Sequence, residues 1–229
     1  MNSPNHSLSR WFRGGAEPAQ SNAQDKGTAG PRTTRRSIGF GEFMRSLQAE
    51  LKSAGEQRLS ILDLGSTSPA NIAFFTEMGL RLSTEDVLRA CKDPDYVARQ
   101  EDGSEAFDPQ KFLADNLTYS EGQFDAVLCW DVADYLPETL VKPLVERIHF
   151  VLKPHGTLLA FFHDKDPGPN SALYRYHITK TDTLEGEPKG TFKLQRIFNN
   201  RHVESLFADF ASRKFFLGRD NYREVIVVR

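Results

Sequence analysis

The chain has 229 residues, enough for one domain of ordinary size with a tail to spare. Its formal net charge of -2 argues against a dedicated nucleic-acid binder, and no apolar run reaches the roughly 18 to 20 residues that a bilayer span requires. Two cysteines, Cys91 and Cys129, are too few for a zinc cluster of usual spacing and fit a reducing compartment. We therefore expect a cytoplasmic protein with no metal site.

Residues 1–36 are rich in Ser, Asn, Gly, Pro and Arg and show no apolar periodicity, which predicts a flexible tail. The tail carries a positive charge surplus. This surplus is open to two interpretations, a targeting peptide or contact with an acidic partner on one side and a solvated leader on the other. We favour the leader and place the folded domain at residues 37–229.

The folded part is expected to open with a helix after Ser37, because apolar residues recur at helical spacing and Gly55 is placed to end it. Strand and helix patterns then alternate. The predicted strands are 58–65, 81–87, 124–130 and 157–163, and the predicted helices are 69–79, a short one led by Pro94, and 137–156, with a polar stretch at 101–109. Apolar strands separated by helices indicate a parallel sheet covered on both faces.

The last sixty residues change character. Two alternating segments, 173–178 and 192–198, predict strands, 199–210 predicts a helix capped by Asn, and 212–229 predicts a hairpin that turns at 218–221. The fold class is therefore α/β, a Rossmann-like, doubly wound and mostly parallel sheet with helices on both faces and a C-terminal antiparallel hairpin.

In such a sheet, ligands bind outside the carboxyl ends of the strands, where the strand order reverses. The strand ends predicted here carry polar residues, namely Asp63, Gly65 and Ser66, then Glu85 and Asp86, then Asp131, and finally His163 and Asp164. Asp86 lies about twenty residues past the Gly65 turn, where a carboxylate can accept hydrogen bonds from ribose hydroxyls. The alternative role for a lone Asp after a strand is a helix cap.

Four segments together resemble class I S-adenosylmethionine-dependent methyltransferases, on the methyltransferase type 11-like branch that modifies small molecules. They are "ILDLG", "STED", "LADNLTYSEGQFDAVLCWDVADYL" and "VLKPHGTLLAF". The resemblance covers about Ile61 to Arg229. It implies S-adenosylmethionine as cofactor and methyl transfer to an unidentified small-molecule acceptor, with no nucleic-acid partner; it does not indicate an oligomeric state.

The resemblance also implies residue roles. Asp63, Gly65 and Ser66 would shape the methionine end of the cofactor pocket, Asp86 or Glu85 would hold the ribose, and Asp115 and Asn116 would meet the adenine edge. Asp131 would lie near the sulfonium and the acceptor. His163 is the best candidate for a base, if the acceptor must lose a proton.

One segment and one further residue depart from the family pattern. Ser66 to Pro69 replace the alternating glycines after Gly65, and His155 stands where the family usually has glycine. The first departure motivates an alternative function, a non-catalytic methyltransferase-like scaffold or interaction protein that has lost cofactor binding. That alternative predicts a pocket obstructed by Pro69 or by the Thr67 side chain. Dehydrogenase chemistry is a less favoured function for this fold, because the full glycine fingerprint is missing.

Overall fold

The computed structural model describes residues 31–168, 172–218 and 220–229. Their main sheet has six strands in the order β10-β11-β7-β6-β2-β3. The strands are β2 (Ser60–Asp63), β3 (Arg81–Thr84), β6 (Phe124–Trp130), β7 (Leu152–His163), β10 (Ser212–Leu217) and β11 (Tyr222–Val228). β3, β2, β6 and β7 run parallel, while β11 is antiparallel to β7 and β10 is antiparallel to β11.

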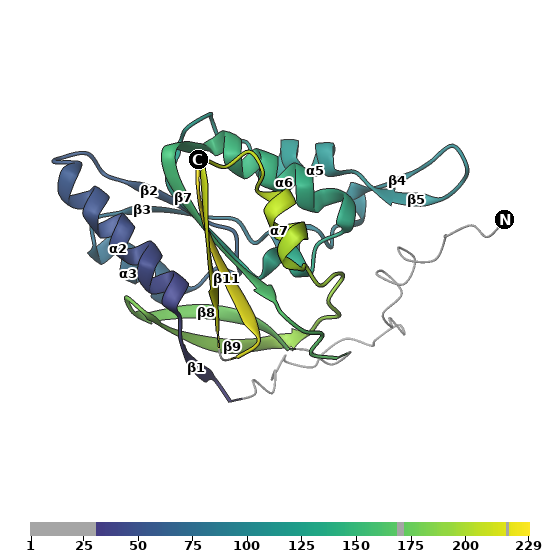
Figure 1. Ribbon diagram of the computed structural model, residues 1–229. Helices are drawn as coiled ribbons and strands as arrows, with labels where there is room; N and C mark the ends of the chain where they lie inside the picture. The colour runs from purple at the N-terminus through teal and green to yellow at the C-terminus, as the bar shows by residue number, and fades with distance from the viewer. Residues whose placement is uncertain (1–30, 169–171, 219) are drawn as a thin grey trace, which may run out of the picture.

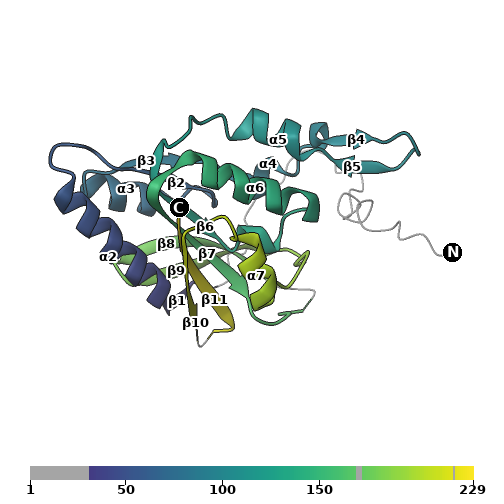
Figure 2. The same ribbon diagram turned by 45° about the horizontal axis from the view of Figure 1, so that its top comes forward.

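All seven residues of β6 are buried, as expected of a central strand that is covered on both faces. One face packs against α2 (Ile38–Ser53) and α3 (Pro69–Glu77). The other packs against α4 (Val87–Ala90), α5 (Pro109–Asn116), α6 (Glu138–Val151) and α7 (Asn200–Leu206) (Figures 1 and 2). The Rossmann-like, mostly parallel sheet and its C-terminal antiparallel hairpin are thus confirmed.

Local sequence signals set the ends of the first two helices. Ser37 caps α2 by accepting the Phe40 N–H, and Ser68 caps α3 by accepting the Asn71 N–H, with Pro69 at the first helical position. Gly79 follows α3 in the left-handed region, at φ +79°.

A second sheet lies beside the first and was only partly predicted. It is antiparallel, in the order β1-β9-β8, with β1 (Thr33–Arg36), β8 (Ala172–Lys180) and β9 (Thr183–Thr191); Figures 1 and 2 show it as a separate layer. β1 lies inside the segment expected to be a tail, so the folded part begins before Ser37; residues 1–30 fall outside the described residues. We name this three-stranded layer the cover sheet.

The strand predicted at 192–198 is wrong. The partner of β8 is β9, whose Gly- and Pro-containing sequence concealed it, while 192–198 runs as a loop that buries Leu194 and Phe198 in the core. The alternation that suggested a strand reflects this one-sided burial.

The polar stretch after Pro94 also differs from expectation. The short helix η1 (Pro94–Tyr96) is confirmed, but β4 (Val97–Arg99) and β5 (Glu105–Phe107) then form a hairpin that projects from the body (Figures 1 and 2). Asp115 and Asn116 lie at the C-terminal end of helix α5. Helix α6 ends at Val151, earlier than predicted, because Lys153 to His155 belong to β7.

Arg35 ties the cover sheet to the main sheet. Its guanidinium lies between the rings of Phe161 and Tyr222, at 4.7 and 4.9 Å from their centroids. It pairs with Glu224, whose side chain is 2% exposed, and with Asp220 at 2.8 Å. Glu224 in turn accepts the Gly39 N–H at the start of α2. A buried charge is stable only when paired in this way.

We therefore expect Arg35→Ala to lower the free energy of unfolding by about 3 to 5 kcal/mol, because it leaves Glu224 buried without its cation. Urea denaturation measures this. The matched control is Arg36→Ala, whose side chain is 82% exposed in its pair with Asp182 and whose loss should cost about 1 kcal/mol or less. Equal losses for the two variants would contradict the anchoring role.

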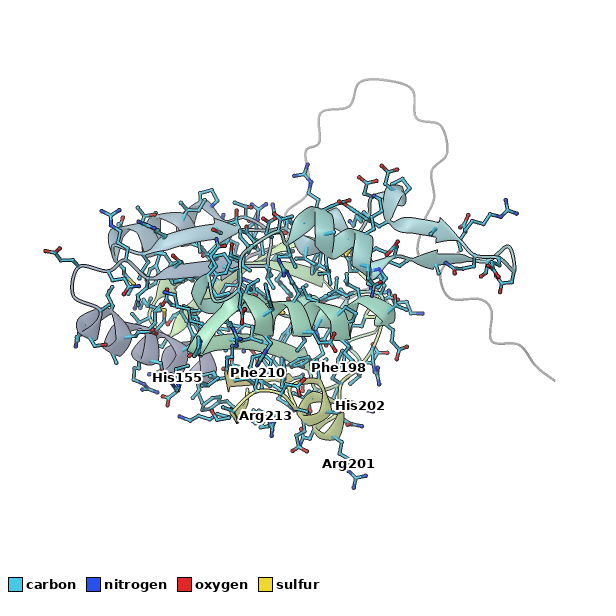
Figure 3. The ribbon with its side chains drawn as sticks, turned by 90° about the horizontal axis from the view of Figure 1, so that it is seen from above. His155, Phe198, Arg201, His202, Phe210 and Arg213 are labelled. Atoms are coloured by element: carbon cyan, nitrogen blue, oxygen red, sulfur yellow. The ribbon has the colours of Figure 1, made fainter. Side chains whose placement is uncertain are left out.

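His155 occupies the left-handed region at φ +67°, which explains why a glycine suits this position. Its exposed side chain lies near the start of β7 (Figure 3). We expect His155→Gly to raise the free energy of unfolding by about 0.5 to 1 kcal/mol. Asn221→Gly, at φ +63°, should give less, because Asn tolerates this conformation. Thermal unfolding of both variants tests the difference.

Candidate functional site

The strand order of the main sheet reverses next to β2. β3 follows β2 on one side, and β6 with β7 lies on the other, so the carboxyl ends of β2, β3 and β6 surround a topological switch point. This is where an open α/β sheet binds its ligand. We call it the strand-end crevice.

Asp63, the last residue of β2, is buried at 1% exposure. Its Oδ1 accepts the Trp130 indole N–H at 2.6 Å and the Gly65 backbone N–H at 3.0 Å, and its Oδ2 accepts from Asn71 Nδ2 at 3.4 Å. Burial raises the pKa of the Asp63 carboxyl, and these donors oppose the rise. Asp63 thus holds the turn after β2 and the end of β6 together.

Trp130 ends β6 in the left-handed region, at φ +49°, which is rare for a bulky residue. Its indole lies directly over Gly65, since a Cβ at that glycine would be 2.5 Å from Trp130 Cδ1. The indole stacks on Tyr176 of β8 at 5.2 Å between ring centroids and contacts Phe161 edge-on at 5.7 Å. The Trp130 side chain therefore occupies the crevice.

Little free space remains beside it. The cavity lined by Gly65, Ser66, Trp130, Asp131 and Tyr176 has a volume of ≈ 10 Å³, about enough for one water molecule. The obstruction expected from Thr67 or Pro69 is wrong, because both residues are exposed. The crevice is closed instead by aromatic side chains from β6 and β8.

The cover sheet is fastened to the turn after β2 by buried polar contacts. Asn71 of α3 donates to the Tyr176 carbonyl at 3.0 Å and accepts the Ile178 N–H at 2.8 Å. Ser68 Oγ lies 2.7 Å from His177 Nδ1, and His177 Nε2 lies 2.8 Å from Glu187 Oε2. These contacts fix β8 and β9 across the crevice.

The histidines at positions 177 and 202 lie in different surroundings. His177 is buried in the chain of contacts just described. His202 is exposed on α7, next to Arg201, which points outward in Figure 3.

Glu85 and Asp86 follow β3 at the edge of the crevice, and both are half-buried. Asp86 is the N-cap of α4, accepting the Arg89 N–H at 3.0 Å through Oδ1, while its Oδ2 accepts from Ser66 Oγ at 3.0 Å. Glu85 accepts the Tyr119 hydroxyl at 2.6 Å. Asp86 therefore caps α4 and also links it to the turn after β2.

Asp115 and Asn116 point to different surroundings. Asp115 is exposed and pairs with Lys111 at 3.2 Å along α5. Asn116 donates to the Tyr96 hydroxyl at 2.9 Å and, with Asp86, lines an open hollow of ≈ 270 Å³ beside α4. The structure brings Asn116 near Asp86 and leaves Asp115 outside this hollow.

The end of β6 and the end of β7 carry a second polar cluster. Asp131 is buried and accepts the hydroxyls of Tyr176 at 3.1 Å and Tyr222 at 3.3 Å. His163 is buried beside it, and Asp134 Oδ2 accepts the His163 backbone N–H at 2.7 Å and lies 2.8 Å from His163 Nδ1. This is the geometry of an oriented imidazole, with the carboxylate fixing the ring.

Asp134, Trp130 and Tyr176 line the candidate site and are not singled out in the sequence analysis above. Asp134 was concealed in an apolar segment, and its i+29 partner His163 is revealed only by the pairing of β6 with β7. One signal was present: a bulky aromatic at the last position of a central strand faces the place where ligands bind.

A further hollow, of ≈ 780 Å³, lies elsewhere, between the start of α2 and the turn of the β10–β11 hairpin. The charged side chains along it, such as Arg36 with Asp182, pair with one another. Within the described ranges, no three His, Cys, Asp or Glu side chains are placed to hold a metal ion. No helix in these ranges has the length and apolar character of a membrane span.

Burial of Asp134 raises its pKa from 3.8 to about 6, although its bonds to His163 act in the opposite direction. The folded protein therefore holds a proton on Asp134 between about pH 4 and pH 6 that the unfolded chain has released. The resulting stabilisation is complete below about pH 4 and is lost as the pH rises through 6.

Asp134→Asn removes this titration while an amide oxygen can still accept from His163. We expect the wild-type free energy of unfolding, minus that of the variant, to fall by up to about 3 kcal/mol between pH 4 and pH 7. Urea denaturation across that range measures it. A difference that does not change with pH would contradict the raised pKa.

Comparison with known proteins gives a family-model match over part of the chain and distant structural likenesses. Residues 62–160 match the family model described as "Methyltransferase domain". No curated protein sequence matches the chain.

The solved structures include a Burkholderia thailandensis 1,6-didemethyltoxoflavin-N1-methyltransferase, 16% identical, covering 81% of this chain and 77% of its own, with a TM-score of 0.41. An S-adenosylmethionine-dependent methyltransferase from Archaeoglobus fulgidus is 10% identical, and the match covers 82% of this chain and 94% of that one, with a TM-score of 0.44. An S-adenosylmethionine-dependent methyltransferase from Mesorhizobium loti is 15% identical, and the match covers 84% of this chain and 88% of that one, with a TM-score of 0.41. Likenesses this distant carry no residue roles.

The family match spans the strand-end crevice, from the end of β2 through β6 to the middle of β7. Over residues 62–160, the chain is therefore similar to a methyltransferase domain.

Proposed function

We propose that this protein transfers a methyl group from S-adenosylmethionine to a small-molecule acceptor, with the cofactor at the strand-end crevice. One observation carries the proposal. Within the matched methyltransferase domain, the Asp63–Gly65 turn after β2 lies next to the carboxylates Glu85 and Asp86 after β3, and Ser66 hydrogen-bonds Asp86 across the two ends.

The outer part of the crevice fits the cofactor. Each carboxylate oxygen accepts more than one hydrogen bond, so Glu85 and Asp86 can accept from ribose hydroxyls beside their present partners. Asn116 offers an amide near Asp86, towards the adenine edge. In this proposal Asp86 caps α4 and also holds the ribose.

The inner part does not fit the cofactor in the conformation described. A ligand pocket for a molecule of this class needs a few hundred Å³, whereas ≈ 10 Å³ remains beside Trp130 and Tyr176. The methionine end fits at Asp63 and Gly65 only if the indole leaves. When bound, the cofactor supplies an activated methyl group on a good leaving group, so the protein contributes mainly by positioning.

For the acceptor, Asp131 and His163 are the candidate groups. Asp134 orients the His163 ring, as a general base requires, and Tyr176 and Tyr222 place hydroxyls at Asp131. His163 would take a proton from an acceptor that must lose one. We also propose a cytoplasmic location, because both cysteines are free and buried.

A second function is favoured by one observation, the closed crevice. A methyltransferase-like scaffold that has lost cofactor binding would keep Asp63 paired with Trp130 and would need no space over Gly65. This function predicts no binding of the cofactor at any concentration, so a binding measurement separates the two candidates.

Titration calorimetry with S-adenosylhomocysteine tests the proposal, and Asp86→Asn is the informative variant. Asn caps a helix as well as Asp does, so α4 should persist while the charge that holds the ribose is lost. We expect roughly 10- to 100-fold weaker binding.

The control is Asp108→Asn, because Asp108 caps α5 in the same manner, through the Lys111 N–H at 2.9 Å, away from the crevice. It should bind like wild type. If Asp86→Asn, alone or combined with Glu85→Gln, binds as tightly as wild type, the ribose role is refuted. Absence of heat for folded wild type at millimolar ligand would favour the scaffold.

A further inference from the structure

The side chain that closes the crevice comes from the very strand whose end should meet the ligand. Trp130 is 3% exposed, and its indole takes the place over Gly65 that a bound ligand would need. A cofactor and this rotamer of Trp130 exclude each other, because both require the same volume above the same glycine.

The two aromatic residues that close the crevice, Tyr176 and Trp130, differ in how many hydrogen bonds hold them in place. Tyr176 belongs to β8, where Asn71 donates to the Tyr176 carbonyl and accepts the Ile178 N–H. The residue between them, His177, contacts Ser68 and Glu187 through its ring nitrogens. The indole of Trp130 has one hydrogen bond, to Asp63, and is otherwise held by ring contacts.

The backbone conformation of Trp130 also favours displacement of its side chain. At φ +49° a bulky residue is held in a conformation that only its surroundings stabilise. The short helix η2 (Val132–Asp134) begins two residues later. Trp130 therefore lies where β6 ends and the next helix begins, and not in the middle of a hydrogen-bonded strand. A rotation at Trp130 therefore disturbs less of the hydrogen-bonded structure than a movement of β8 does.

We propose that Trp130 is an internal plug of the strand-end crevice, which occupies the place of the cofactor in the ligand-free protein and is expelled when S-adenosylmethionine binds. This inference rests on the proposed function and adds its regulation. Asp63 has a double role: it holds the indole when the crevice is closed and faces the methionine end when it is open.

If the plug must leave before the cofactor binds, the apparent affinity for the cofactor equals the intrinsic affinity multiplied by the fraction of molecules in which the plug is displaced. Removing the indole should therefore strengthen binding, whereas ordinary damage to the core should not. The chain offers a suitable contrast in Phe162, the neighbouring buried aromatic of β7, whose ring packs against Phe198 and Phe207 on the opposite face of the sheet.

The first experiment is titration calorimetry of S-adenosylhomocysteine with wild type, Trp130→Gly and Phe162→Leu, each checked for folding by circular dichroism. We expect at least roughly tenfold tighter binding by Trp130→Gly and unchanged affinity in Phe162→Leu. Trp130→Phe, which keeps a smaller ring and loses the bond to Asp63, should lie between wild type and Trp130→Gly; it also serves if the glycine variant does not fold.

The second experiment uses the indole itself as the reporter. The sequence has two tryptophans, Trp11 and Trp130, so Trp11→Phe leaves Trp130 as the single tryptophan. Its emission should be that of a buried indole without ligand. Saturation with S-adenosylhomocysteine should shift the emission to longer wavelength and increase quenching by acrylamide.

The outcomes separate the plug from the proposed function. If wild type binds and Trp130→Gly binds with equal affinity, and the Trp130 emission is unchanged at saturation, the plug is refuted while cofactor binding stands. Binding by Trp130→Gly without binding by wild type supports the plug in its strongest form. If no folded variant binds at millimolar ligand, both the plug and the cofactor role fail, and the scaffold remains.

Discussion

The hydrogen bond from the Trp130 indole to Asp63 is the contact on which the strand-end crevice depends. A carboxylate at 1% exposure must be paired or protonated, and Asp63 receives donors from the β2 turn, from α3 and from the end of β6. The indole donor brings a large ring with it. Pairing the buried charge and closing the crevice are therefore one event.

This contact changes the physical meaning of Gly65. A glycine after the first strand is normally explained by the close approach of a cofactor to the backbone. Here a Cβ at position 65 would lie 2.5 Å from Trp130 Cδ1, so the closed protein requires the glycine as well. Under the proposed function, the same glycine would admit the cofactor once the indole is displaced.

The cover sheet fixes the positions of the side chains that close the strand-end crevice. Arg35 joins β1 to the main sheet through Glu224, and Asn71 and His177 join β8 to α3. Buried polar contacts of this kind contribute modest net stability but cost a great deal when half-broken. They leave Tyr176 in a fixed place, against which Trp130 stacks and from which Asp131 accepts a hydrogen bond.

The sequence by itself determined the elements with strong local signals. The buried strand β6, the caps Ser37 and Ser68, and the C-terminal hairpin follow from apolar runs, capping side chains and turn residues that act within a few positions. It also named the strand-end residues, because the carboxyl ends of parallel strands must meet at one edge. Only the tertiary structure decided which strand β8 pairs with, that Asp134 holds His163, and that Trp130 fills the space over Gly65. Those outcomes depend on contacts between residues 29 to 67 positions apart or on a competition between neighbouring segments for one partner, and no local pattern records either.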